Sequence, residues 1–410
     1  MTRDRPHQMI ISAFAAFAAF GSCWGVWGGS VPRVQHQAGV NDGQLGLALL
    51  FVGAGALPAM LLAGRALDRW GLTVAAVVIG ALGVAGAGLA LTAVNLASLC
   101  VGLALVGATS GAADVAMNAV AGRAEKVAGR PVITRAHGVF STLVVLASLA
   151  TGWASAESLP LAVPFIAVAA LSMAACAFLL KTLPAGVTHD RIRTADQAAS
   201  DGRIAPFVLI GVLGALAFAS ENAHQSWSAV FAHDELHSGV GLSAVAPAVF
   251  AGVVAITRFS IGGLKPVHAR TVLLAGAMTA AAGTALIAIT PTLLVAGLGL
   301  AAAAAGTAVL FPTLLSVVSQ NVDESRRGRA TSVVTTVSYL GFLVGPVYVG
   351  VWADAVGLRG AMVAVAALAV GLFVLTPALL RLSGFGNPTH HSNDQATSRT
   401  PLSAGQQPSC

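Results

Sequence analysis

The sequence contains unusually few charged residues. Only 9% of its 410 residues are Asp, Glu, Lys or Arg, whereas 56% are hydrophobic. A soluble globular protein carries roughly 25% charged residues, because its surface must stay hydrated. So few charges cannot cover a water-facing surface of this size. The composition therefore excludes an ordinary soluble domain and indicates an integral membrane protein.

The sequence also lacks the motifs of common enzymes and metalloproteins. It has no Walker phosphate-binding loop, which disfavours transport driven by ATP, and no serine in a nucleophile-elbow pattern. The four cysteines, Cys23, Cys100, Cys176 and Cys410, show neither paired nor metal-like spacing. We therefore expect no enzymatic activity, no bound metal and no cofactor.

The positive charges lie almost entirely on one side of the chain's apolar runs. A membrane-spanning helix needs about 20 mainly apolar residues. Spans of this kind are expected near 9–30, 44–64, 73–93, 97–120, 136–155, 160–180, 206–231, 243–264, 271–290, 292–318, 331–352 and 359–380. Of the 22 Lys and Arg residues, 20 then fall on one side and only Arg33 and Arg359 on the other. Because positive charge is retained in the cytoplasm, the pattern predicts twelve transmembrane helices with both termini cytoplasmic.

The net charge of +6 follows from this topology and does not predict nucleic-acid binding, because the basic residues sit in short loops beside an anionic inner leaflet. The expected location is the cytoplasmic (inner) membrane of a bacterium, as a multi-pass protein. The expected partners are the lipid bilayer and a small-molecule substrate. We expect the chain to act as a monomer.

The polar segments divide the chain into two halves. The longest polar connector, 181–205, is expected to be a cytoplasmic linker between six-helix bundles at 1–180 and 206–381, and the polar tail at 382–410 is expected to be disordered. The sequence Gly-Leu-Ala-Leu at 102–105 recurs as Gly-Leu-Gly-Leu at 297–300, an offset of 195. Such a recurrence is what a parallel internal repeat predicts.

A short motif follows the second span. The octet 64–71 has glycine at both ends and an Asp-Arg pair between them, at Gly64, Asp68, Arg69 and Gly71. With twelve spans in two halves, this octet resembles the signature of the major facilitator superfamily. The resemblance implies two pseudo-symmetric six-helix bundles that alternate access to a central site. It also implies that Asp68 contacts the start of helix eleven, near Ala330, in the outward-facing state.

Other stretches resemble one branch of that superfamily more closely. They lie at 114–119, 129–131, 137–141, 227–230 and 339–346, and are similar to uncharacterised bacterial facilitators allied to fucose-permease-like proteins. The resemblance implies no particular substrate. In drug–proton antiporters a Gly-Pro pair is usual in helix five, whereas here it stands on helix eleven, as Gly345-Pro346. This difference makes efflux the less favoured direction of transport.

Two acidic residues lie far from both ends of their spans, Asp114 in the fourth and Glu221 in the seventh. Ionisable groups at membrane depth are costly and are functional by default. A carboxyl group in a poorly solvated cavity takes up a proton more readily, so Glu221 first and Asp114 second are predicted to couple transport to protons. The alternative for both is a hydrogen bond that only fixes helix packing. Arg258 is expected to snorkel to the cytoplasmic surface or, alternatively, to form an ion pair with Asp114.

Polar and aromatic residues near these acids are candidates for the substrate cavity: Asn118, Asn222, Gln225, Trp227, Trp24 and Trp27. The expected function is secondary active transport of a small neutral or cationic solute by alternating access, with a proton gradient as the energy source. One alternative is an antiporter that expels drugs or toxic metabolites. Another is a membrane sensor that uses the facilitator fold without transport.

Overall fold

The computed structural model describes residues 4–130, 132–183, 204–261, 269–322 and 324–385, and the part of the chain within these ranges is almost entirely helical. Most of the predicted linker and tail lie outside the described residues. The first half consists of α1 (Asp4–Ala38), α2 (Asp42–Trp70), a short 3₁₀ turn (Gly71–Thr73), α3 (Val74–Thr92), α4 (Leu96–Ala128), α5 (Ile133–Ala156) and α6 (Ala162–Thr182).

The second half begins with α7 (Ala205–Val230), which continues as a π-helical turn, η2 (Phe231–Glu235). It is followed by α8 (Val240–Ser243), α9 (Val245–Ile261), α10 (Ala269–Ile289), α11 (Leu293–Ala308), α12 (Leu310–Asn321) and α13 (Glu324–Leu382). The span predicted as one helix at 292–318 is interrupted at Val309, which separates α11 from α12. Within α13, Gly357 has a non-helical backbone with φ of 78° and divides the element into two helices.

Capping residues explain several of the helix ends. Asn41 and Asn95 each accept a hydrogen bond from the backbone three residues later and form capping boxes at the starts of α2 and α4. Gly71 and Gly129 end α2 and α4 with positive φ, a conformation in which glycine has no steric penalty. The polar residues of the loops thus fix where the apolar helices begin and end.

Ten helical stretches in the described part of the chain are long and apolar enough to cross a bilayer. Two of them, Asp42–Thr92 and Ala330–Leu382, are 51 and 53 residues long and contain the glycines with positive φ at 71 and 357. The protein is therefore an all-helical, multi-pass membrane protein.

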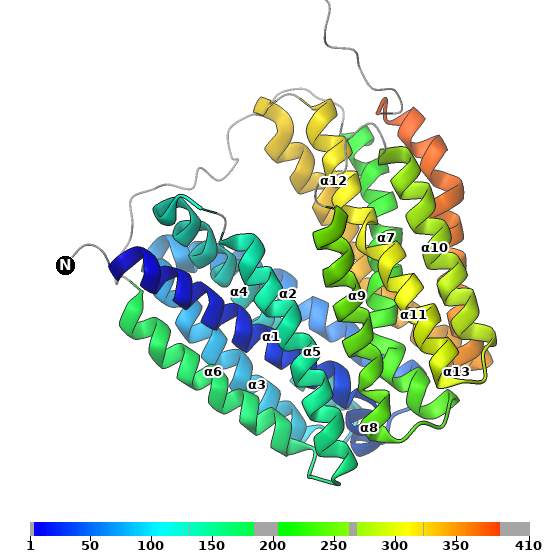
Figure 1. The fold of residues 1–410 in the computed structure, drawn as a ribbon, viewed down its shortest axis with the longest axis horizontal. Coiled ribbons are helices and arrows are strands. Elements are labelled where there is room, and N and C mark those ends of the chain that lie inside the picture. Colours follow the sequence, from blue (N-terminus) through cyan, green and yellow to red (C-terminus); the bar gives the residue numbers. More distant parts are fainter. Residues whose placement is uncertain (1–3, 131, 184–203, 262–268, 323, 386–410) are drawn as a thin grey trace, which may run out of the picture.

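The helices form two groups that meet at one end (Figure 1). Helices α1 to α6 pack together on one side and α7 to α13 on the other, and their lower ends converge near α8 while their upper ends diverge. Contacts between the groups support this view: Ser148 Oγ of α5 donates to the Ala244 carbonyl at 2.8 Å, and a Cβ on Gly46 of α2 would lie 2.8 Å from the Cα of Gly350. The molecule is closed at this end, which we call the closed end.

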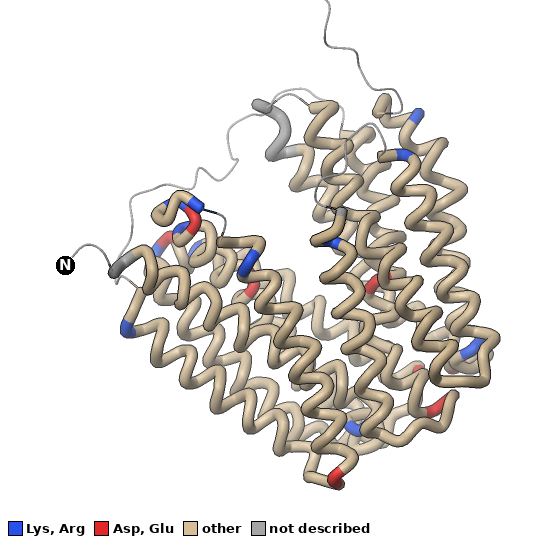
Figure 2. Tube along the Cα trace, in the orientation of Figure 1, with Lys and Arg blue, Asp and Glu red and all other residues tan. Residues whose placement is uncertain are grey.

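Charged residues follow the same axis (Figure 2). The basic positions drawn in blue gather mainly toward the upper ends of the helices, where the two groups diverge. At the closed end, Arg33 donates to Ser155 Oγ at 3.1 Å and to the Leu159 carbonyl at 2.7 Å. Arg359 donates to Glu235 at 2.6 Å and to the carbonyls of Ala288 and Thr290. Arg33 and Arg359, the two basic residues expected on the side opposite to the other twenty, therefore both form hydrogen bonds with connecting segments at the closed end.

Candidate functional site

An ion pair joins α7 to α9 in the second group of helices. Arg258 Nη2 lies 2.9 Å and 3.2 Å from the two carboxylate oxygens of Glu221, and Arg258 Nε donates to the Ala308 carbonyl at 3.3 Å. The Arg258 side chain is 44% exposed and that of Glu221 is 16% exposed. The expectation that Arg258 snorkels to the cytoplasmic surface is wrong, and its partner here is Glu221 and not Asp114. Because Glu221 offers two oxygens nearby, the guanidinium gains more from this pair than from extending to the interface.

The other candidate acid, Asp114, lies on α4 in the first group of helices. Asn118, one turn later on α4, donates to its carboxylate at 3.2 Å and to its backbone carbonyl at 2.9 Å. Among the described residues Asp114 forms no ion pair, so Asn118 supplies its nearest hydrogen-bonding partner. The two acids thus have different partners: Glu221 pairs with the Arg258 guanidinium, and Asp114 accepts from the Asn118 amide.

Each acidic site is faced by a residue from the opposite group of helices. His137 of α5 lies within electrostatic range of Arg258, and Tyr339 of α13 lies within electrostatic range of Asp114. His137 also packs edge-on against Phe17 with ring centroids 4.9 Å apart. Both acids therefore lie near the boundary between the two groups, where a transporter of this shape would bind its solute.

Four aromatic rings form a cluster that sequence reasoning missed. Phe218 lies 4.2 Å from Phe311, 5.5 Å from Tyr339 and 6.3 Å from Phe342, measured between ring centroids. All four side chains are half-buried. Phe218 precedes Glu221 by one turn of α7, and Tyr339 lies within electrostatic range of Asp114. The cluster therefore lies between the two acids. The chain has only two tyrosines. The one sequence feature that could have indicated this cluster is the position of Tyr339 in the family-like stretch 339–346.

Asn222 and Trp227 of α7 form hydrogen bonds to α13. Asn222 Nδ2 donates to the Phe342 carbonyl at 2.6 Å, and Trp227 Nε1 donates to the Pro346 carbonyl at 3.2 Å. Trp227 is 0% exposed and Asn222 is 7% exposed. Pro346 has no N–H to donate to Phe342, four residues earlier, so Asn222 satisfies the carbonyl that the proline leaves free. Both side chains are therefore engaged by α13 in this conformation, and their contact with substrate stays a prediction, as it does for the half-buried Gln225.

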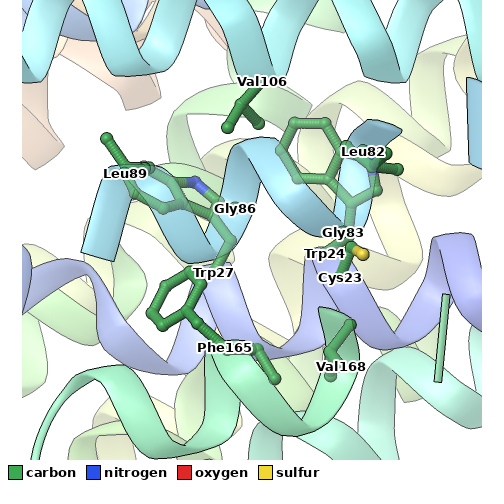
Figure 3. A pocket seen from close by; sticks show the side chains of 11 residues that line it. Cys23, Trp24, Trp27, Leu82, Gly83, Gly86, Leu89, Val106, Phe165 and Val168 are labelled. Atoms are coloured by element: carbon green, nitrogen blue, oxygen red, sulfur yellow. The ribbon is translucent and has the colours of Figure 1, made fainter. Parts of the chain in front are cut away.

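Trp24 and Trp27 lie in a separate place, inside the first group of helices (Figure 3). They line a narrow crevice with residues of α3, α4 and α6, among them Leu89, Val106 and Phe165. Its lining is almost entirely apolar, and Trp27 is only 7% exposed. In this conformation the two tryptophans fill space between helices of the first group, and their contact with substrate stays a prediction.

The octet at 64–71 lies at the end where the two groups diverge. Asp68 and Arg69 are exposed, and the Arg69 guanidinium lies 5.7 Å from the centre of the Trp70 ring. A side chain at Gly64 would meet no described atom within 4 Å. The contact between Asp68 and the start of helix eleven is expected in the outward-facing state, and it stays a prediction. Gly71 ends α2 with φ of 73°, which explains the glycine at that position.

Gly345 and Pro346 lie where α13 crosses α7. A Cβ on Gly345 would lie 2.7 Å from the Ala219 carbonyl oxygen, so only glycine permits this close approach. The Pro346 carbonyl accepts the hydrogen bond from Trp227, and the missing N–H of Pro346 leaves the Phe342 carbonyl free for Asn222. This pair therefore acts as a packing element between two helices that border the central boundary.

The comparisons with known proteins agree with this architecture. The family model of the Major Facilitator Superfamily matches residues 12–296 and 266–406. An uncharacterized MFS-type transporter from Yersinia pestis is 27% identical over 346 residues, which is 82% of this chain and 87% of the relative. An uncharacterized transporter from Sinorhizobium fredii is 28% identical over 358 residues, or 85% of this chain and 92% of the relative.

Solved structures share the fold at low sequence identity. A bacterial homologue of the human lysosomal transporter Spinster, inward-facing and unoccupied, has a TM-score of 0.74 and 16% identity, covering 93% of this chain and 99% of that one. The inward-open xylose transporter XylE from E. coli has a TM-score of 0.70 and 13% identity, covering 94% and 98%. The family model, which matches most of the chain, assigns it to a class of membrane transporters. The chain belongs to the Major Facilitator Superfamily, as the octet at 64–71 indicated.

Proposed function

We propose that the protein is a secondary active transporter that moves a small neutral or cationic solute through a bacterial cytoplasmic membrane by alternating access, coupled to protons. The observation that carries the proposal is the pair of acids at the boundary between the two groups, of which Glu221 faces Arg258 and Asp114 faces Asn118. Two acids against one base give this region a net negative charge. Such a field disfavours an anionic solute and favours a neutral or positively charged one.

The proposed topology has twelve spans with both termini in the cytoplasm. A straight helix of 51 residues would measure about 77 Å at roughly 1.5 Å per residue, more than twice the roughly 30 Å of bilayer hydrocarbon. Division of the two longest stretches at Gly71 and Gly357 turns ten stretches into twelve. Because most basic residues lie at the diverging end, that end is the cytoplasmic one, and this conformation is inward-facing. The proposed bundles are 1–180 and 206–381.

Proton coupling is proposed through Glu221, with Asp114 as the second site. Protonation of Glu221 removes the charge that holds Arg258, and Arg258 also holds the Ala308 carbonyl at the break between α11 and α12. A proton or a cationic solute that competes for Glu221 therefore weakens a link between α7, α9 and α11 together. The partial exposure of Arg258 allows this exchange from the cavity side.

The aromatic cluster narrows the class of solute. Half-buried Phe and Tyr rings attract cations through their faces, by about 0.5–2 kcal/mol each. Asn222 and Trp227 are occupied by α13, so the polar stretch of α7 offers less to a sugar-like solute than its sequence indicated. The same cluster favours a second candidate function, the efflux of a lipophilic cation in exchange for protons.

The test begins with a thermal-shift screen of the purified protein against organic cations, nucleosides, sugars and antibiotics at two pH values. A ligand that binds the native state raises the unfolding temperature according to its concentration relative to Kd. The stabilising solute is then followed in proteoliposomes with an imposed pH gradient. We expect gradient-driven flux in the wild type and at least a tenfold loss in Glu221→Gln.

A matched control separates coupling from general damage. Glu157→Gln makes the same change in an exposed acid at the closed end, and it should retain full flux. If Glu221→Gln transports as well as Glu157→Gln under a pH gradient, Glu221 does not couple transport to protons. If no solute moves while one binds and alters the protein's stability, the sensor alternative replaces the transporter.

A further inference from the structure

A second cavity lies inside the other group of helices, away from the ion pair. It lies between α7, η2, α8, α9, α10, α11 and α13 and has a volume of about 120 Å³. Figure 1 shows α8 at the closed end of the molecule. The cavity therefore belongs to one group of helices and not to the boundary between the two.

The cavity wall is apolar except at two side chains of α7. His224 has both ring nitrogens engaged, with Nδ1 2.6 Å from the Ser220 carbonyl oxygen and Nε2 2.9 Å from Thr284 Oγ1. Ser228 lines the same cavity, is 9% exposed, and its hydroxyl has no hydrogen-bond partner among the described residues. Many helical hydroxyls in this protein, such as that of Thr284, donate to the carbonyl four residues earlier. The hydroxyls of Ser30 and Ser220 are also buried without a described partner, but of the three only Ser228 lines this cavity. A buried hydroxyl without a partner costs about 1–3 kcal/mol, so Ser228 marks a position where a ligand atom would be stabilised.

The two halves of the chain differ in how this position is filled. In the first half, the side chain of Leu89 lies directly over Gly102. At the repeat offset of 195, Gly102 corresponds to Gly297 and Leu89 to Thr284. A Cβ on Gly297 would meet nothing within 4 Å. The shorter Thr284, turned to His224, thus leaves empty the space that a leucine fills in the other half.

The chemistry of the wall limits what can occupy it. No Asp, Glu, Lys or Arg is among the described residues that line the cavity, so a charged group inside would be unpaired and strongly disfavoured. Leu242 and Val245 line the cavity and are 58% and 38% exposed, and Leu294 and Leu298, which follow the lining residues Leu293 and Gly297, are 77% and 60% exposed; we call these four the rim residues. In a bilayer these rim residues face hydrocarbon, which makes lipid the medium from which a ligand enters.

We propose that this cavity binds a neutral single-chain amphiphile, such as a long-chain alcohol, whose chain passes over Gly297 and whose hydroxyl group hydrogen-bonds to Ser228. The chain then extends between α9 and α11 into the outer leaflet. The ligand abuts the start of α9, next to Ala244, whose carbonyl accepts the hydrogen bond from Ser148 at the closed end. This site is independent of the proposed solute and of proton coupling.

The test uses the full chain in lipid vesicles with hexadecanol that carries a photoreactive diazirine in mid-chain. After illumination, mass spectrometry of peptides locates the attached label. We expect label in 240–249 and 293–300, saturation with increasing probe, and competition by excess hexadecanol. Label that rises in proportion to the probe without saturation, or that excess hexadecanol does not displace, would mean simple partition into the bilayer and would overturn the proposal.

Two variants make the test specific. Gly297→Leu fills the cavity where no protein atom obstructs it and should lower the labelling at least tenfold. Gly371→Leu is the matched control, a helical glycine that also has nothing within 4 Å and lies outside the cavity, and it should label like the wild type. Equal labelling of the two variants would refute the site.

Ser228→Ala tests the hydroxyl contact without changing the shape of the cavity. Loss of one neutral hydrogen bond should reduce the preference for hexadecanol over hexadecane, measured as competition against the probe, by about fivefold. An unchanged preference would exclude Ser228 as the recognition group. Because this substitution is small, it keeps the proposal testable even if Gly297→Leu does not fold.

Discussion

Pro346 and Asn222 should contribute to stability as a coupled pair. Pro346 cannot donate to the Phe342 carbonyl, and Asn222 from α7 donates to it at 2.6 Å instead. Asn222→Ala leaves a buried carbonyl without a partner. That loss costs about 1–3 kcal/mol by general measurements, although hydrogen bonds between helices in membrane proteins average nearer 0.6 and reach about 1.7 kcal/mol. Since this bond is short and its acceptor has no donor in its own helix, we expect about 1.5 kcal/mol.

The cost of losing the Asn222 hydrogen bond can be separated from the cost of lost packing by making Asn222→Ala in a Pro346→Ala protein. In Pro346→Ala the backbone N–H of residue 346 is restored and can donate to Phe342 within α13. Asn222→Ala should then cost only about 0.5 kcal/mol, because the packing loss remains but the carbonyl is satisfied. The coupling energy of the cycle is thus about 1 kcal/mol, above the roughly 0.3–0.5 kcal/mol scatter of independent sites.

The assay is the free energy of unfolding of all four proteins, measured by reversible unfolding in mixed detergent micelles. Asn118→Ala is the control, because Asn118 bonds within its own helix α4 and should be additive with Pro346→Ala. Additivity of Asn222→Ala with Pro346→Ala within about 0.4 kcal/mol would refute the reasoning. In that case the contribution of the Asn222 hydrogen bond to stability would not depend on the absence of a backbone N–H at residue 346.

Further predictions concern the closed end and the buried tryptophan. In Gly350→Leu the new Cβ would lie 2.8 Å from backbone atoms of Asp42 and Gly46, so closure should cost about 1–3 kcal/mol. A cysteine introduced at Gln35, which is 8% exposed, should then react with an impermeant maleimide about tenfold faster, and an unchanged rate would contradict this account of closure. Trp227→Phe should lower the free energy of unfolding by about 1 kcal/mol through loss of the bond to the Pro346 carbonyl, and a stability equal to the wild type would show that the bond adds nothing.

Local features of the molecule could be predicted from residue order. The apolar runs predicted the approximate positions of the helices, although α1 and α4 each end eight residues beyond the predicted span. Asn41 and Gly71 show how residues outside the apolar run set the ends of a helix. The hydrogen bond between Asn118 and Asp114 was predictable in the same way, because residues four apart share a helix face. The octet at 64–71 indicated the family, which the family model confirms.

Partners across helices could not be predicted in this way. Glu221 and Arg258 are 37 positions apart, and the choice of Glu221 over Asp114 depends on how α7 and α9 are rotated toward each other. In a bilayer the hydrophobic effect does not set that rotation, since lipid is as apolar as the helix surfaces. Small residues and single polar contacts set it instead, as Gly345 and Asn222 do between α7 and α13.

The sequence by itself determined that this protein lies in a lipid bilayer, that it is a membrane transporter of one superfamily, and roughly where each helix lies. Charge density and the length of apolar runs depend only on residue order. The tertiary structure decided which polar side chains face the boundary between the two groups of helices and which are consumed by packing. It also decided that a hollow remains over Gly297 where Leu89 fills its counterpart over Gly102. These outcomes depend on contacts between distant segments, and residue order constrains such contacts only through the packing of the whole molecule.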